Sequence, residues 1–231
     1  VERIMHMVDG CLLLVDAFEG TMPQTRFVLK KAIEAKVKPI VVINKVDRPN
    51  ADPSKAIDEV LELFLELGAD DSMLDFKVIY TSGLKGTSSL NADPATQVPG
   101  MEAVLDTIIS EIPEPQVQEN GPFQFQPALL DYNDFVGRIG IGCIKRGTVK
   151  VNDNVTCNRL DGTTRNFRIQ KLFGYFGLKR IEIQEAHAGD IIAIAGLMDI
   201  NVGETICEEG NNEILPLLRI DPPTIQMTFG T

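Results

Sequence analysis

Hydrophobic residues in the first half of the chain gather into three short runs that predict parallel strands. The runs are CLLLVD at Cys11–Asp16, PIVVIN at Pro39–Asn44 and KVIYTS at Lys77–Ser82. Apolar and β-branched side chains occupy successive positions in each run, so both faces of each strand would be buried. This pattern is typical of a parallel sheet that helices cover on both sides.

Helical patterns connect and follow these runs. The predicted helices extend from Pro23 to about Lys36, from Pro53 to Gly68 and from about Met101 to Ile112. Asp52 would cap the second helix and Gly68 would stop it, while Pro113 ends the third. Three β-α units in succession predict an open α/β domain over residues 1–113.

The pattern changes after a polar segment that contains prolines. Residues 114–122 show no apolar periodicity, and we interpret them as an interdomain linker. The strands predicted beyond this linker are Phe123–Leu130, Val136–Lys145, Asn154–Asn158, Thr164–Leu172 and Ile191–Ala195. Short alternating strands separated by turn residues favour a small closed β-barrel over residues 123–212. Residues 213–231 resemble the start of a third, truncated domain.

Composition narrows the class of protein. Of the 231 residues 44% are hydrophobic and 24% are charged, and no apolar run approaches the roughly 18 residues of a membrane-spanning helix. Four cysteines are scattered without CxxC spacing, so we expect neither a zinc site nor a disulfide framework and favour a reducing cytosol. The chain begins with Val1 inside patterned sequence, and we interpret it as an internal piece of a longer protein.

The net charge of −11 is unevenly distributed along the chain. Residues 1–121 contain 11 basic and 20 acidic residues. The stretch from Arg138 to Arg180, which we call the basic stretch, contains ten basic residues and two acidic ones. It is either a solvated face of the barrel or a surface that contacts the phosphates of a nucleic acid.

The clearest candidate for chemistry is Asn44-Lys45-Val46-Asp47, which follows the second predicted strand. Ligands of open α/β sheets bind beyond the carboxyl ends of the strands, so this position suits a nucleotide. The motif resembles the NKxD sequence of GTP-binding proteins. That resemblance implies that Asp47 accepts two hydrogen bonds from the guanine edge, that Asn44 meets a ring nitrogen and that the Lys45 stem lies over the base.

A second motif supports this interpretation. NKxD alone is weak evidence, because Asn and Asp often make turns or cap helices after strands. The third predicted strand, however, ends in Ser82-Gly83-Leu84-Lys85-Gly86, which resembles the fifth guanine motif of the same proteins. The resemblance implies that Ser82, Gly83 and Leu84 brace the guanine carbonyl, although the glycines could also be plain turn residues.

Longer segments resemble one family over essentially the whole chain. VDAFEGTMPQT resembles translational GTPases of the elongation factor G and Tu group. NKVDRPNADP, TSGLKGTSS, LDYNDFVGRIGIGCIKRGTVK and HAGDIIAIAGLMDINVGETI resemble the TypA/BipA branch. This resemblance implies the carboxyl-terminal part of a P-loop GTPase domain followed by a translation-factor β-barrel.

The same resemblance implies cofactors and partners. We expect GTP or GDP with Mg²⁺, whose ligands would lie upstream of Val1. We also expect a monomeric, cytoplasmic, ribosome-associated protein that functions in ribosome assembly and the stress response. The basic stretch would contact small-subunit rRNA.

Several motifs of a complete GTPase are missing from the 231 residues. The sequence has no GxxxxGK[ST] loop, no threonine-bearing switch segment and no DxPGH motif. We therefore expect no catalytic residue and no metal ligand in this chain, and no GTPase activity from it. His6 and His187 are interpreted as surface or structural residues, and Asp9 and Asp16 as turn or cap residues.

Two alternatives stay open at this point. The first is another translational GTPase, such as elongation factor G, LepA or a ribosomal protection protein. The second is a non-catalytic RNA-binding or assembly module, in which the barrel functions and the α/β part is a scaffold.

Overall fold

The structure, a computed structural model, describes residues 1–217. It divides into two compact units, one over Val8–Glu114 and the other made of Glu2–Met7 and the residues from Pro115 onward. Most of the third domain predicted for residues 213–231 lies outside the described residues. No helix within residues 1–217 is both long and apolar enough to cross a membrane.

The first unit is built on three parallel strands, as predicted. They are β1 (Gly10–Asp16), β2 (Lys38–Asn44) and β3 (Val78–Ser82), and they lie side by side in this order. Two short strands, β4 (Thr87–Ser89) and β5 (Val98–Pro99), extend the sheet in antiparallel fashion beside β3. The sequence did not reveal β4 and β5 because they are very short and contain polar residues or proline.

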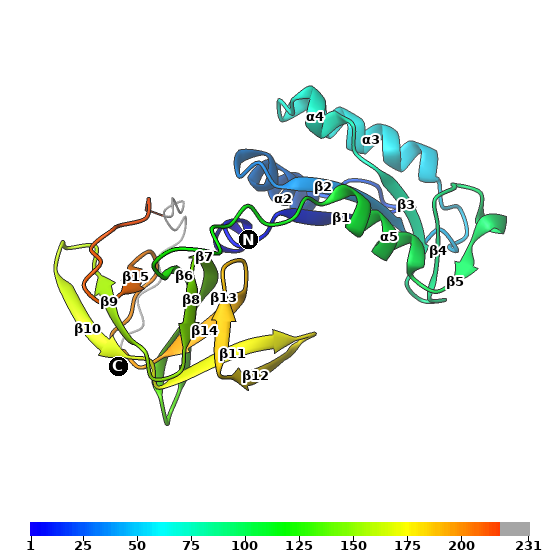
Figure 1. The fold of residues 1–231 in the computed structure, drawn as a ribbon. Coiled ribbons are helices and arrows are strands. Elements are labelled where there is room, and N and C mark those ends of the chain that lie inside the picture. The colour runs from blue at the N-terminus through cyan, green and yellow to red at the C-terminus, as the bar shows by residue number, and fades with distance from the viewer. Residues whose placement is uncertain (218–231) are drawn as a thin grey trace, which may run out of the picture. The chain divides into compact units, whose positions relative to one another are not determined.

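Helices cover both faces of this sheet (Figure 1). The helices are α2 (Pro23–Glu34), α3 (Pro53–Glu66), α4 (Asp71–Leu74) and α5 (Glu102–Glu111), with a 3₁₀ turn at Pro94–Thr96. Leu29 of α2 and Phe64 of α3 pack in one buried cluster with Val41 and Ile43 of β2. Ile108 of α5 packs in a second cluster on the opposite face.

Burial of the parallel strands differs from the prediction at β1. Both faces of β2 are buried, with Ile40, Val41 and Ile43 all inaccessible. On β1, by contrast, residues alternate between buried and exposed, and Leu12 and Leu14 are exposed. The difference arises because Leu13 and Val15 belong to the cluster under α2 and α3, whereas the cluster against α5 on the other face is built on residues of β2 and β3.

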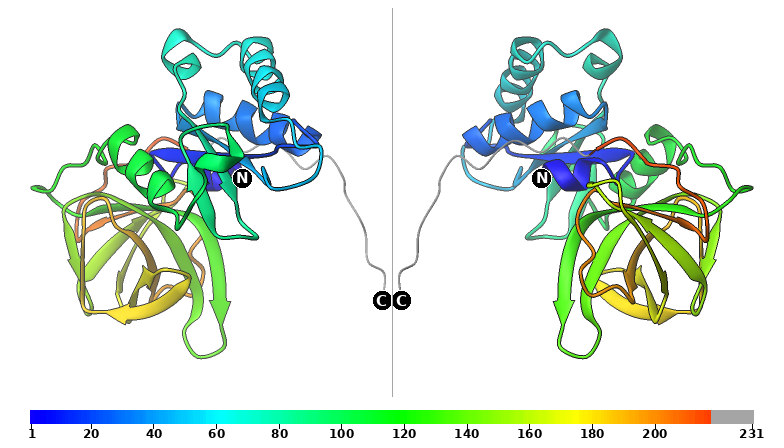
Figure 2. Two further views of the ribbon diagram at one scale, coloured as in Figure 1. Left: turned by 90° about the vertical axis from the view of Figure 1, so that its right-hand side faces the viewer. Right: turned by 90° about the vertical axis from the view of Figure 1, so that its left-hand side faces the viewer.

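The second unit is an antiparallel β domain, as predicted. Its strands are β6 (Gln124–Asn133), β7 (Gly137–Arg146), β8 (Thr148–Lys150), β9 (Asn154–Asn158), β10 (Thr164–Arg168), β11 (Lys171–Phe176), β12 (Lys179–Ile183), β13 (Glu185–His187), β14 (Ile191–Ala195) and β15 (Thr205–Glu208). Eight strands form one sheet in the order β10-β9-β15-β6-β7-β14-β11-β12, and β13 pairs with β8. The strands of this domain curve around its core in Figure 2. Among the described residues no ladder joins β10 to β12, so the hydrogen-bonded sheet of this barrel has two ends.

The strand predicted at Thr164–Leu172 is interrupted in the structure. It consists of β10, which pairs with β9, and β11, which pairs with β14 and β12. Between them Ile169 is fully buried and donates its N–H to the carbonyl of Asp153, while the Gln170 N–H bonds to Ala195. The chain changes partner strands at this corner, and alternation of apolar residues does not reveal such a change.

Segments at both ends of the β domain bond to its strands. The short helix α1 (Glu2–Met5) contacts β6. The carbonyl of Gln118 accepts from Gly147 N–H, and Leu215 N–H bonds to the Thr205 hydroxyl. The linker at 114–122 and the domain boundary at 213 stay predictions.

Helix α3 offers a test of the predicted cap. The Asp52 carboxylate accepts a hydrogen bond from Lys55 N–H at 3.0 Å, which satisfies one of the free donors of the first turn. Asp52→Ala should lower the free energy of unfolding by about 1 kcal/mol in urea titrations. Asp58→Ala, an exposed site within the same helix, is the matched control and should change it by less than about 0.5 kcal/mol. Equal effects of the two substitutions would contradict the cap.

Candidate functional site

The ends of the three parallel strands form one row of polar side chains. Asp16 of β1 is in register with Asn44 of β2, and Asn44 is in register with Thr81 of β3. These are the carboxyl ends of the strands, where open α/β sheets bind their ligands. The two predicted motifs, one after β2 and one after β3, are therefore brought together.

Asn44 connects the two motifs through one atom. Its Oδ1 accepts hydrogen bonds from Lys45 N–H at 2.8 Å, Gly83 N–H at 3.0 Å and the Thr81 hydroxyl at 3.1 Å. The amide nitrogen of Asn44 has no hydrogen-bond partner within residues 1–217. The Asn44 side chain thus fixes the turn after β3 with its oxygen, and its amide nitrogen is available as a donor.

Asp47 is joined to Ser82 of β3. A hydrogen bond from the Ser82 hydroxyl is the main reason that the pKa of Asp47 lies below its ordinary value, and the charges of Lys85 and Arg48 add to this effect. Ser82 is buried, and its hydroxyl oxygen also accepts from Lys85 N–H. Asp47 is consequently an oriented carboxylate that stays ionised at neutral pH.

Lys45 adopts an uncommon backbone conformation. Its φ is +66°, in the left-handed region that side-chain-bearing residues rarely occupy. Its ammonium lies 2.6 Å from Oδ2 of Asp16, and the guanidinium of Arg48 lies 3.2 Å from the same oxygen. The Lys45 side chain is therefore held at the end of β1.

Asp16 has the turn role that its sequence position predicts, together with a second role. Its Oδ1 accepts from the N–H groups of Phe18 and Glu19. Burial opposes its ionisation, but the hydrogen bonds from Lys45, Phe18 and Glu19 hold the pKa of Asp16 below its ordinary value. Within residues 1–217, no cluster of three or more His, Cys, Asp or Glu side chains is placed to hold a metal ion.

The glycines after β3 differ in their conformational needs. Gly86 has a φ of +63° with open space around it, as expected of a turn glycine. Gly83 has no such φ, and a β-carbon there would lie 3.6 Å from Asn44 Oδ1, an ordinary contact. Leu84 exposes 92% of its surface. Gly83 therefore does not depend on a left-handed conformation, and the Leu84 side chain lies in solvent.

Two residues that position these groups were not predicted for the site. Thr81 bonds to Asn44, and Asp16 bonds to Lys45. Strand register could have revealed both, because each lies directly beside Asn44 on a neighbouring strand.

The set of groups fits a guanine edge. An ionised carboxylate accepts hydrogen bonds and cannot donate them, and guanine presents an N–H and an amino group side by side. The free amide nitrogen of Asn44 can donate to a ring nitrogen, and the lysine stem offers an apolar surface.

In the folded domain most cations of the basic stretch lie beside carboxylates. Six of its ten cations have carboxylate partners, in the pairs Arg146–Glu213, Lys150–Glu185, Arg159–Asp199, Arg165–Asp199, Lys171–Glu182 and Arg180–Asp131. Residues 115–217 contain thirteen acidic residues against these ten basic ones. Most of the charge that is segregated along the sequence is therefore neutralised in the folded domain.

The two histidines make structural contacts. The carbonyl of His6 accepts from Lys145 at 3.2 Å. The ring Nδ1 of His187 lies 3.1 Å from the Thr148 hydroxyl oxygen, and the backbone N–H of His187 donates to the Asp190 carboxylate. His6 makes its contact through the backbone, so the surface or structural roles expected of the two side chains stay predictions.

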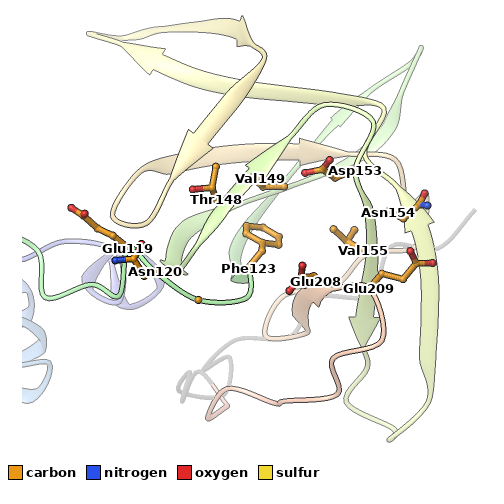
Figure 3. Close-up of a pocket in the computed structure, with 11 residues that line it drawn as sticks. Glu119, Asn120, Phe123, Thr148, Val149, Asp153, Asn154, Val155, Glu208 and Glu209 are labelled. Atoms are coloured by element: carbon orange, nitrogen blue, oxygen red, sulfur yellow. The ribbon is translucent and has the colours of Figure 1, made fainter.

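A polar pocket in the β domain does not fit a nucleotide. It has a volume of about 670 Å³, and its lining includes the carboxylates of Glu119, Asp153, Glu208 and Glu209 (Figure 3). No lysine, arginine or histidine lines it. Four carboxylates without a cation would repel a phosphate group, so the strand ends of the α/β unit are the better nucleotide site.

Comparison with protein families matches both units. The family model described as the elongation factor Tu GTP binding domain matches residues 1–114. The model described as elongation factor Tu domain 2 matches residues 137–207.

Curated relatives match nearly the whole chain. The large ribosomal subunit assembly factor BipA of Bacillus subtilis is 58% identical over 99% of the chain. The proteins of the same name from Escherichia coli K12 and Synechocystis are 50% and 48% identical over 99% and 100% of the chain. The chain spans 37% or 38% of the length of these relatives.

A solved structure supports the fold. It is the translation elongation factor SelB of Methanococcus maripaludis, in complex with the GTP analogue GPPNHP. The TM-score is 0.66 at 19% identity, and the match covers 91% of this chain and 43% of that one.

The Ser82–Asp47 hydrogen bond predicts a pH effect. Because the pKa of Asp47 is lowered in the folded protein, the bond stabilises the fold above the ordinary value of 3.8, and this contribution is lost as the pH falls through the folded pKa. Ser82→Ala should raise the pKa of Asp47 toward 3.8 in a carboxyl ¹³C NMR titration. Thr81→Val removes a hydroxyl that bonds to Asn44 and not to Asp47, so it should leave the pKa of Asp47 unchanged. An Asp47 titration that Ser82→Ala does not move would refute the assignment.

Proposed function

The chain belongs to the TypA/BipA family of translational GTPases, and from this membership we propose that the intact protein binds and hydrolyses GTP on the ribosome. Its role would be in ribosome assembly and the stress response. The observation that carries the proposal is that Asn44, which accepts from Gly83 N–H, and Asp47, which accepts from the Ser82 hydroxyl, both contact the end of β3. Relatives named BipA at 48–58% identity favour this branch over elongation factor G or LepA.

Each residue of the site has a proposed part in guanine recognition. Asp47 accepts the two adjacent N–H groups of the guanine edge, and Asn44 donates its amide N–H to a ring nitrogen. Lys45 lays its aliphatic stem over the base. Ser82, Gly83 and Leu84 brace the guanine carbonyl, and the backbone N–H groups of the turn are suited to this because the Ser82 hydroxyl is engaged with Asp47 and Lys85.

The carboxylate accounts for selection against adenine. Adenine would direct an acceptor lone pair toward the negative charge of Asp47 and leave a carboxylate oxygen unpaired. A charge-assisted hydrogen bond is about twice as strong as a neutral one, so its loss is a large penalty. The lowered pKa of Asp47 keeps the carboxylate charged at neutral pH.

The phosphates and Mg²⁺ require residues other than those of this chain. Its sequence contains neither the GxxxxGK[ST] loop nor the DxPGH motif. We propose that these contacts, and the catalytic groups, come from parts of the protein outside the 231 residues. Those parts would then bind the phosphates of GTP or GDP, and the guanine site of this chain would bind the base.

The proposed partner is the ribosome, in the cytoplasm, with a monomeric protein. The cations of the basic stretch that lack a carboxylate partner within residues 1–217 are Arg138, Lys145, Arg168 and Lys179. We propose that contact with small-subunit rRNA uses these four, since paired cations neutralise phosphates less readily. The name of the relatives refers to assembly of the large subunit, so the small-subunit contact rests on the family resemblance alone.

Because the phosphate-binding and catalytic groups are proposed to lie outside these 231 residues, we predict that the chain alone does not hydrolyse GTP. GTP turnover by the 231-residue chain should stay at the uncatalysed level, with and without ribosomes, because the groups that hold the phosphates are missing from its sequence. Release of inorganic phosphate measures this directly. Ribosome-stimulated hydrolysis by the chain would overturn the prediction.

Guanine selectivity is the test of the recognition site. In the full-length protein, labelled GDP should be displaced by GTP but not by ATP. Asp47→Ala should weaken GDP binding by about tenfold or more, as expected for loss of a charge-assisted hydrogen bond. Asp58→Ala, an exposed carboxylate on α3, is the control and should bind GDP normally.

The opposite outcome would favour the rival function. If GDP and ATP compete equally and Asp47→Ala has no effect, while RNA binds with strong salt dependence, the protein is a non-catalytic RNA-binding module. The α/β unit would then be a scaffold.

A further inference from the structure

Asp16 uses both carboxylate oxygens for different purposes. Oδ1 accepts from Phe18 N–H at 2.9 Å and so closes the turn after β1. Oδ2 accepts from the Lys45 ammonium at 2.6 Å and lies 3.2 Å from the Arg48 guanidinium. The turn needs only the first oxygen. The second one is directed at the segment that follows β2.

This pair differs from an ordinary surface ion pair. The Asp16 side chain is only 10% exposed, whereas those of Lys45 and Arg48 are each 44% exposed. Exposed pairs hold their side chains weakly, because water competes and two long chains lose freedom. Here the backbone N–H groups fix the acceptor, so only the lysine has to be ordered.

The segment after β2 is therefore anchored on two sides. Lys45 reaches the end of β1 through Asp16, and Asp47 reaches the end of β3 through Ser82. The backbone agrees with this arrangement, because Ala17 N–H bonds to the Asn44 carbonyl and Asp52 N–H bonds to the Ala17 carbonyl. The two anchors lie on opposite neighbours of β2.

We propose that Asp16 is a positioning residue of the guanine site, which holds the Lys45 ammonium so that the Lys45 stem is set in place to cover the purine. The inference rests on the proposed function. Asp16 does not touch the base itself. Because Asp16 already orders the lysine side chain in the free protein, less conformational entropy is lost when a nucleotide binds.

A double-mutant cycle in the full-length protein tests this role. Asp16→Asn keeps an oxygen for the turn but removes the charge, and it should weaken binding of fluorescent GDP about fivefold or more. In a Lys45→Ala background the same change should have less than a twofold effect, because the lysine it positions is gone. Glu19→Gln, a neighbouring carboxylate-to-amide change, is the matched control. Thermal unfolding of each variant confirms that it is folded.

A comparison of GDP with inosine diphosphate separates positioning from edge recognition. Inosine lacks the amino group that Asp47 would read, so Asp47→Ala should abolish the preference for GDP. Asp16→Asn should weaken both nucleotides equally and leave their ratio unchanged, because the lysine stem covers the face of the base. General damage to the fold would also weaken both nucleotides, and it is separated from positioning by the dependence of the Asp16→Asn effect on Lys45 and by the thermal unfolding of each variant.

The outcomes distinguish the two claims. If Asp47→Ala abolishes the preference but Asp16→Asn has no effect, or has the same effect with and without Lys45, then the role of Asp16 is refuted and the guanine site stands. If wild-type protein shows no preference for GDP over inosine diphosphate, the contact of Asp47 with the guanine amino group fails, and if ATP competes with GDP equally, the proposed function itself fails.

Discussion

The candidate site depends on the side-chain oxygen of Asn44. Three donors converge on it, from the next residue, from Thr81 on β3 and from Gly83 in the turn after β3. Without this acceptor, the hydroxyl of the buried Thr81 and the N–H groups of Lys45 and Gly83 would need other partners. One oxygen thus sets the distance between two loops that are 37 to 39 residues apart in the sequence.

The rest of the arrangement follows from the parallel sheet. Because β1, β2 and β3 end in register, Asp16 and Thr81 lie on either side of Asn44. The left-handed conformation of Lys45 separates the directions of the motif's side chains, so that Lys45 meets β1 and Asp47 meets β3. The segment after β2 is thus held by contacts with both strands that neighbour β2.

The sequence alone predicted the parallel strands, the main helices and the two site motifs. These features have strong local signals, namely apolar runs, the cap at Asp52 and motif spacing. The pairing of Asp16 with Lys45 has no local signal, because it depends on strand register. Neutralisation of the basic stretch was hidden for the same reason, since partners such as Asp131 and Asp199 lie outside it in sequence.

A crystal structure of the full-length protein with bound GDP tests the central claim most directly. The account predicts that both carboxylate oxygens of Asp47 lie within hydrogen-bonding distance of the guanine edge, that the Asn44 amide nitrogen meets a ring nitrogen, and that Asn44 Oδ1 keeps its bonds to Thr81 and Gly83. A base bound away from Asp47, or an Asn44 oxygen released from β3 to contact the nucleotide, would contradict it.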